Sequence, residues 1–157
     1  MKHVLAVLPL LLAACAPATT PADPPTGPVP LANDRAQPVL ALFEHVLGDY
    51  FTAGSTSLPT TCVTLRPVPL NAQQEEALIL RFVRLAPAAR CRVQGSGATD
   101  TITNQPAAVV QVYDFTCADA DHCTGWALQP GQPATRYALR YEAGAWRFAS
   151  DRRIIAE

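Results

Sequence analysis

Closely spaced prolines divide this chain into two parts. Residues 16–37 read APATTPADPPTGPVPLANDRAQ, and no later segment is as rich in proline. Each proline lacks a backbone N–H donor and pushes the residue before it toward an extended conformation, so we expect no helix or sheet there. The sequence predicts a tether over residues 15–37 and one globular domain over residues 38–157. A docking ligand for a partner protein is the alternative interpretation of the prolines.

The N-terminus has the pattern of an export signal. A short basic start precedes an apolar run over residues 4–12, and Leu12-Ala13-Ala14-Cys15 follows. The run is much shorter than the roughly twenty residues that cross a bilayer as a helix, so it is typical of a cleaved signal. The arrangement resembles the lipobox of bacterial lipoproteins, which implies a signal peptide over residues 1–14 and a lipidated Cys15. The alternative is cleavage by an ordinary signal peptidase.

The resemblance also implies a location. Several acyl chains on Cys15 would anchor the protein stably, because stable anchoring needs more than one chain. Ala16 stands where an aspartate would resemble the inner-membrane retention signal. The expected location is therefore the periplasmic face of the outer membrane, if the cell has two membranes.

The net charge of the chain argues against nucleic acid as a partner. The formal net charge is −1, and Lys2 is the only lysine. No basic field for nucleic acid is present. Besides the membrane itself, we expect an envelope protein or a small apolar ligand as partner.

Helical periodicity dominates the first half of the domain. Pro38 suits the first position of a helix, and apolar residues then recur at helical spacing, namely Val39, Leu42, Phe43, Val46, Leu47, Tyr50 and Phe51. Residues 62–65 fit a short strand. Asn71 and Gln74 resemble a capping box that begins a second helix, although residues 79–83 could instead form a strand.

The second half alternates with a period of two, as strands do. Tyr137, Leu139 and Tyr141 precede a turn at residues 142–145, and Trp146 and Phe148 follow it. These five residues share one face, which leaves Arg136, Arg140 and Arg147 on the other. The fold class expected is α+β, one small domain with N-terminal helices packed on an antiparallel sheet. The order is loosely similar to the cystatin-like or nuclear-transport-factor-2-like fold, which implies a curved sheet that wraps a helix.

Four cysteines remain in the domain, at positions 62, 91, 117 and 123. An even number in an exported chain predicts disulfides. Three pairings are open, of which we favour Cys117–Cys123, a bridge across a short loop, with Cys62–Cys91 as the second. Zinc is the competing interpretation, and the absence of a Cys-x-x-Cys pair disfavours it.

Candidate functional residues gather within the loop that a Cys117–Cys123 bridge would close. Asp119, Asp121 and His122 lie between Cys117 and Cys123, where they could bind a metal or form a solvated turn; the sequence lacks the further acidic positions of a calcium loop. The segment Gly95-Ser96-Gly97 near Asp100 indicates a flexible loop rather than a nucleophile elbow. His45 is expected on the surface of the first helix.

Aromatic residues form the last candidate group. Trp126, Tyr137, Tyr141 and Trp146 could line a concave pocket or simply fill the core. We expect a non-catalytic binding domain, with speculative contacts from Asp119, Asp121, His122, Trp126, Tyr137 and Tyr141, and with neither cofactor nor metal. The alternatives are a tethered hydrolase or metal-dependent enzyme that uses the Asp119/Asp121/His122 loop, and a structural envelope component.

The lipobox interpretation predicts the effect of one substitution. Cys15→Ser should abolish fatty-acid labelling and block lipoprotein processing, because the serine hydroxyl cannot form the thioether to the diacylglycerol. Metabolic labelling with a fatty-acid analogue checks this, with Cys62→Ser as the matched control that keeps its label. A Cys15→Ser protein that still incorporates fatty acid would refute the interpretation.

Overall fold

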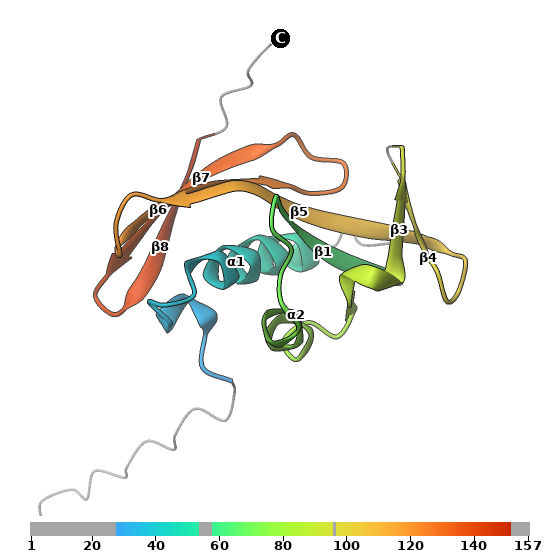
Figure 1. The fold of residues 1–157 in the computed structure, drawn as a ribbon, viewed down its shortest axis with the longest axis horizontal. Coiled ribbons are helices and arrows are strands. Elements are labelled where there is room, and N and C mark those ends of the chain that lie inside the picture. Colours follow the sequence, from blue (N-terminus) through green and yellow to red (C-terminus); the bar gives the residue numbers. More distant parts are fainter. Residues whose placement is uncertain (1–27, 54–57, 96, 152–157) are drawn as a thin grey trace, which may run out of the picture.

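In the computed structural model, which describes residues 28–53, 58–95 and 97–151, a curved sheet of eight strands covers two helices (Figure 1). The α+β class is therefore as expected. Cys15 and the predicted signal peptide lie outside the described residues. In chain order the elements are η1 (Leu31–Asn33), α1 (Pro38–Thr52), β1 (Thr60–Arg66), α2 (Ala72–Ile79), β2 (Leu85–Ala86), η2 (Ala88–Arg90), β3 (Cys91–Gln94), β4 (Gly97–Asp100), β5 (Pro106–Cys117), β6 (His122–Leu128), β7 (Thr135–Glu142) and β8 (Ala145–Asp151).

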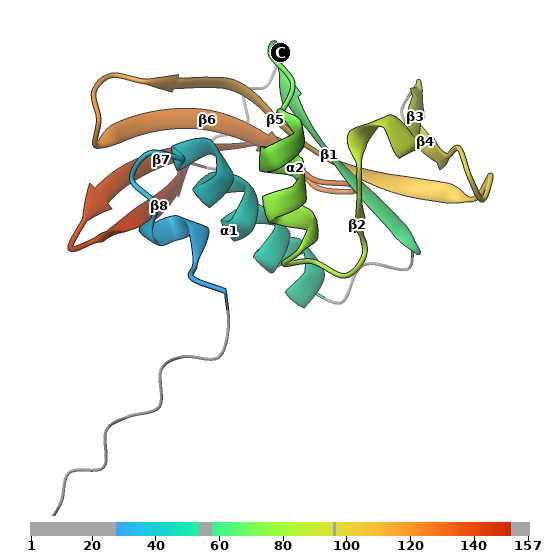
Figure 2. The ribbon, with the colours of Figure 1, turned by 60° about the horizontal axis from the view of Figure 1, so that its bottom comes forward.

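The sheet is mostly antiparallel, with one parallel region that the sequence does not predict. Its strands follow the order β2-β1-β5-β6-β7-β8, and the β3–β4 hairpin attaches to β5 through β4. β1 runs parallel to both β2 and β5. A parallel pair needs a long crossover, and the chain between β1 and β5 supplies it with α2 and the β3–β4 hairpin (Figure 2).

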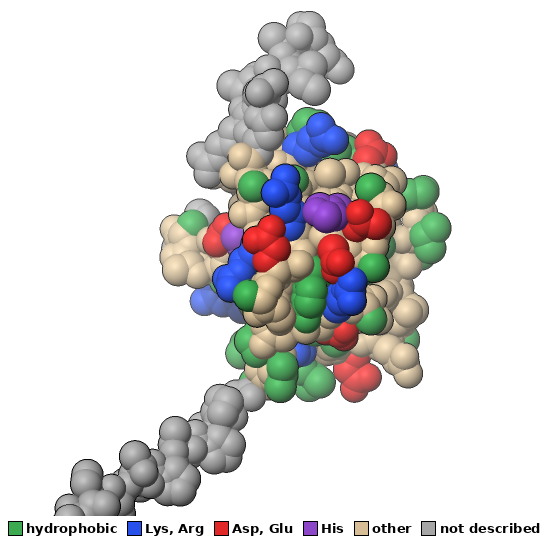
Figure 3. Space-filling view, turned by 90° about the vertical axis from the view of Figure 1, so that its left-hand side faces the viewer, with side chains coloured by type: hydrophobic (Ala, Val, Ile, Leu, Met, Phe, Trp, Pro, Cys, Tyr) green, Lys and Arg blue, Asp and Glu red, His purple; other side chains and the backbone are tan. Residues whose placement is uncertain are grey.

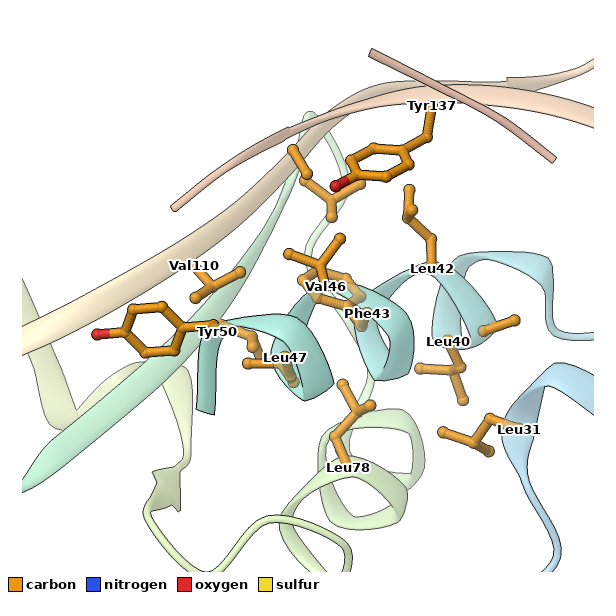
Figure 4. Packing of buried hydrophobic residues seen from close by; sticks show 14 of the residues in the cluster. Leu31, Leu40, Leu42, Phe43, Val46, Leu47, Tyr50, Leu78, Val110 and Tyr137 are labelled. Carbon is orange, nitrogen blue, oxygen red and sulfur yellow. The ribbon is translucent and has the colours of Figure 1, made fainter. Parts of the chain in front are cut away.

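Helix α1 is buried on two sides. Leu42 and Val46 point toward the sheet, near Tyr137, while Leu78 of α2 contacts the opposite side of the helix (Figure 4). Seven of its residues are buried: Leu40, Ala41, Leu42, Phe43, Val46, Leu47 and Tyr50. The buried arc is thus wider than the stripe that the sequence predicts, because the helix lies between two layers rather than on one.

Helix α2 begins with the predicted capping box. The Asn71 side chain accepts a hydrogen bond from the Gln74 backbone, and the Gln74 side chain accepts one from the Asn71 backbone. The helix ends at Ile79, and Leu85–Ala86 form β2. Both the helix predicted to continue beyond residue 79 and the alternative strand over residues 79–83 are therefore wrong. Within the described part of the chain, no helix has the length and apolar character needed to cross a bilayer.

The packed part of the chain begins before Pro38, which differs from the predicted tether boundary. Residues 28–37, the N-terminal arm, contain a short 3-10 helix whose Leu31 is buried in the core. The arm is held by backbone carbonyls that accept hydrogen bonds from Trp146 Nε1 and from the Tyr141 hydroxyl. Proline density excludes regular helix and sheet, but it does not prevent a single leucine from docking on a helix.

The β7–β8 hairpin forms as predicted. Ala143 and Gly144 both have positive φ, at 52° and 79°, which is the backbone of a two-residue type I′ turn. Tyr137, Leu139 and Trp146 are buried on the side toward α1, the inner face. Arg136, Arg140 and Arg147 are exposed on the opposite side, the outer face.

A bulge in β5 turns one aromatic ring into the core. The β5–β6 register slips between Tyr113 and Thr116, and Asp114 has a φ of 50°. Phe115 consequently packs on the inner face over Gly125, where a Cβ would lie only 2.7 Å from the Phe115 ring. Gly125 is therefore required for this close approach.

Both predicted disulfides are present. Cys62–Cys91 joins β1 to the start of β3, and Cys117–Cys123 joins the paired ends of β5 and β6. The first bridge fixes the base of the β3–β4 hairpin to the sheet. The second closes the loop that holds Asp119 and Asp121.

Burial of Leu31 in the N-terminal arm predicts that substitutions at Leu31 and at nearby Val29 differ in their effect on the free energy of unfolding. Leu31→Ala should lower the free energy of unfolding by roughly 2–4 kcal/mol, because it removes a buried side chain. Val29→Ala, at a side chain that is 70% exposed, should change it by less than about 0.5 kcal/mol. Urea denaturation measures both, and equal effects would contradict the docked arm.

Candidate functional site

The β5–β6 loop is ordered by its own polar groups. The Asp119 carboxylate accepts hydrogen bonds of 2.8 Å from the backbone N–H groups of Asp121 and His122, and lies 2.9 Å from His122 Nδ1. The bond from the Asp121 backbone, followed by the His122 side chain, holds the pKa of Asp119 below its usual range. The loop is therefore a folded turn in which Asp119 orients the His122 imidazole.

Asp121 is paired with the N-terminal arm. Its two carboxylate oxygens each lie 2.7 Å from a guanidinium nitrogen of Arg35. Both side chains are substantially exposed, so the pair contributes little to stability, but it fixes the arm against the loop. Among residues 28–53, 58–95 and 97–151, no cluster of three or more His, Cys, Asp or Glu side chains could hold a metal ion.

The candidate aromatic residues do not lie together, because they belong to two different faces of the sheet. Tyr137 and Trp146 are core residues on the inner face, and Tyr141 packs edge-on against Trp146. Trp126 instead stacks on Tyr113, its cross-strand partner, with ring centroids 6.2 Å apart. Because Trp126 belongs to the outer face, it cannot share one pocket with Tyr137 and Tyr141.

His45 has more partners than the sequence indicates. Its ring stacks on Phe148 with centroids 4.4 Å apart, meets Tyr137 edge-on, and lies 3.7 Å from the Asp49 carboxylate. The side chain is half-buried rather than on an open helix surface. Sequence periodicity could not show this, because the contact comes from β8, about a hundred residues later.

The outer face is organised in rows across the strands. Tyr113, Trp126 and Arg136 are register neighbours in one row, and His122, Arg140 and Arg147 form another. Between them lies a row of small residues, Thr116, Thr124, Ala138 and Ala149. Thr116, Thr124 and Ala138 of this row line a shallow cavity of about 330 Å³ beside His122 and Arg140.

A larger groove opens on the same face. It measures about 400 Å³ and lies over β1 and β5, between the β3–β4 hairpin and the β6–β7 loop. Val93 and Leu128 contribute exposed apolar side chains, and Arg66 and Gln111 contribute polar ones. The sequence does not reveal this groove, because its walls come from four segments that are distant in the chain.

The buried carboxylate of Asp100 supports the β3–β4 hairpin, which forms one wall of the groove. Residues 91–100, in which the sequence suggests a loop around Gly95-Ser96-Gly97, form the β3–β4 hairpin instead; Ser96 itself lies outside the described residues. At the base of the hairpin, Asp100 is fully buried and lies 2.7 Å from Arg90 Nη2. The Thr60 hydroxyl donates a further bond of 2.7 Å.

These contacts change the acidity of Asp100. The Arg90 guanidinium, helped by Thr60 and by the backbone N–H of Ile102, holds the pKa of Asp100 well below its usual range, although burial opposes the shift. The carboxylate therefore remains ionised and links β4, η2 and β1. We regard this cluster as the support of the hairpin rather than as a reactive site, because all its bonds are internal.

Comparisons of the chain with protein-family models, with curated proteins and with solved structures found no significant match.

Asp100 gives a prediction about pH. A native pKa below the ordinary value of about 3.9 means that the ionised carboxylate stabilises the fold above that pH, and that this stabilisation is lost as the pH falls through the native pKa. Asp100→Asn should therefore destabilise the protein most near pH 7, and the difference from the wild type should shrink below about pH 4. Chemical denaturation at a series of pH values measures this.

Glu76→Gln is the control for that series, because Glu76 is exposed on α2. Its effect should be small at every pH. A difference between the wild type and Asp100→Asn that grows on acidification would contradict the assigned ion pair.

Proposed function

We propose that this protein is a lipid-anchored binding protein of the bacterial envelope, which holds a small, largely apolar ligand in the groove on the outer face. The observation that carries the proposal is the groove itself, about 400 Å³ between the β3–β4 hairpin and the β6–β7 loop. Ligand pockets in proteins typically measure about 300–1,000 Å³ and combine apolar walls with a few polar groups.

The lining favours a ligand with a small polar part. Val93, Val109 and Leu128 provide apolar contacts, while Gln111 and Arg66 offer hydrogen-bond donors. Arg66 forms no ion pair within 4.0 Å in the described part of the chain. A ligand with an apolar body and one polar or acidic group would complement this surface.

The inner face is already occupied, which also favours the outer one. The core residues of β5–β8 pack on α1, and their aromatic rings contact the helix or the N-terminal arm. A cavity of about 280 Å³ does remain there at the C-terminal end of α1, where Tyr137, Asp49 and Gln129 are among the lining residues, but it is smaller than the groove. Elsewhere on that face a ligand would have to displace α1.

The lipobox resemblance supports the anchoring part of the proposal. The described chain begins at Pro28 on the helix side of the molecule, opposite the outer face (Figure 1). A tether that leaves from that side would keep the groove accessible from the periplasm. A structural envelope component with the same anchor would differ only in having a macromolecule as its partner.

One observation favours the hydrolase alternative. Asp119 bonds Nδ1 of His122, which is the way a carboxylate orients an imidazole for general base catalysis. Serine, the nucleophile that such pairs commonly serve, is not among the described residues that line the cavity beside His122, although Thr116 and Thr124 are. We therefore place this alternative second.

The groove can be tested with small apolar fragments by NMR on the full chain in a neutral detergent. Fragments should shift the amide resonances of Val93, Val109 and Leu128. The double variant Val93→Ser/Leu128→Ser should bind about ten-fold more weakly, since tenfold corresponds to about 1.4 kcal/mol. Val68→Ser is the matched control, because Val68 is 70% exposed and outside the groove.

Shifts confined to the inner face, or equal losses in the control, would contradict the groove. Hydrolysis of esters, peptides or glycans that disappears in a folded His122→Ala protein would favour the enzyme instead.

A further inference from the structure

The outer face carries a row of basic side chains, the His122/Arg140/Arg147 row, at the end away from the groove. His122 on β6 pairs with Arg140 on β7, and Arg140 pairs with Arg147 on β8. Paired residues project from the same face of a sheet, and all three are exposed. Like charges directly opposite each other destabilise a sheet. The Arg140–Arg147 pair is therefore unfavourable for the fold alone.

The described acidic residues do not neutralise these arginines. Among the described side chains, no carboxylate lies within 4.0 Å of Arg140 or Arg147, although Glu142 lies two residues from Arg140 on the same strand. Asp119 and Asp121, the nearby loop carboxylates, are engaged with His122 and Arg35. Both guanidinium groups thus keep their donors available.

Space for a bound group lies beside the row. The small side chains of Thr124 and Ala138 floor the cavity of about 330 Å³ that His122 and Arg140 also line. Arginine presents a planar fork of donors that matches the two oxygens of a carboxylate or phosphate. Asp119 positions the imidazole at the edge of the same cavity.

We propose that His122, Arg140 and Arg147 form an oxyanion site, which binds the phosphate or carboxylate group of a small soluble ligand. The site is distinct from the groove and does not depend on the groove having a ligand. It assigns a role to His122 that the Asp119/His122 geometry alone leaves open: with Nδ1 donating to Asp119, the protonated imidazole donates through Nε2 to a bound anion.

A small soluble ligand fits this end of the molecule better than an anionic membrane does. Acidic and basic side chains are mixed there (Figure 3), and Asp119, Asp121 and Glu142 would meet a flat anionic surface at the same time as the arginines. The outer face also lies opposite the side on which the described chain begins.

Titration of the full chain in a neutral detergent with inorganic phosphate, and separately with acetate, tests the site. At least one anion should produce saturable amide shifts at His122, Ala138 and Arg140 with millimolar affinity. Arg140→Gln/Arg147→Gln should weaken that binding at least five-fold. Arg92→Gln, a matched exposed arginine on β3 away from the site, should leave it unchanged.

Thermal denaturation shows whether the variants fold. Arg140→Gln should raise Tm at low salt, because it relieves the repulsion from Arg147, and the gain should diminish at high salt. The proposal is overturned by the absence of saturable shifts with either anion, by an equal loss in Arg92→Gln, or by a large fall in Tm for Arg140→Gln. Stronger arginine-dependent binding to phosphatidylglycerol vesicles than to either anion would assign the row to a membrane instead.

Discussion

Burial of α1 between two layers is the interaction on which the rest of the structure depends. The curved sheet covers one side of the helix, and α2 with the N-terminal arm covers the other. Most of the inner face is used in this packing, including the rings of Tyr137 and Trp146. The inner face therefore leaves less room for a ligand than the outer face, where the larger groove lies.

The outer face is shaped by elements that add little to the core. Cys62–Cys91 and the buried Asp100–Arg90 pair fix the base of the β3–β4 hairpin, which forms one wall of the groove. Cys117–Cys123 holds the loop from which Asp119 orients His122. Both disulfides thus lie next to the surfaces that we propose to bind ligands, so they stabilise the sites as well as the fold.

Patterns within short stretches of the sequence predict the elements that form locally. The features that these patterns do not predict depend on contacts between segments distant in the chain. The helix from Pro38, the capping box at Asn71, the β7–β8 hairpin and both disulfides follow from residue spacing and turn chemistry. The parallel β1–β5 pairing, the docking of Leu31 and the stacking of His45 on Phe148 depend on partners far along the chain. Aromatic character alone groups Trp126 with Tyr137, whereas strand register puts them on opposite faces.

We propose that the outer face, and not the helix side, meets the partner in the envelope. Hydroxyl-radical footprinting of the protein in intact envelopes and after purification tests this most directly. Val93, Trp126 and Leu128 should be labelled in the purified protein and protected in the envelope, while Leu80 and Val83, which are exposed near α2, should be labelled equally in both. Unchanged labelling of the outer face, with protection at Leu80 and Val83, would contradict the account.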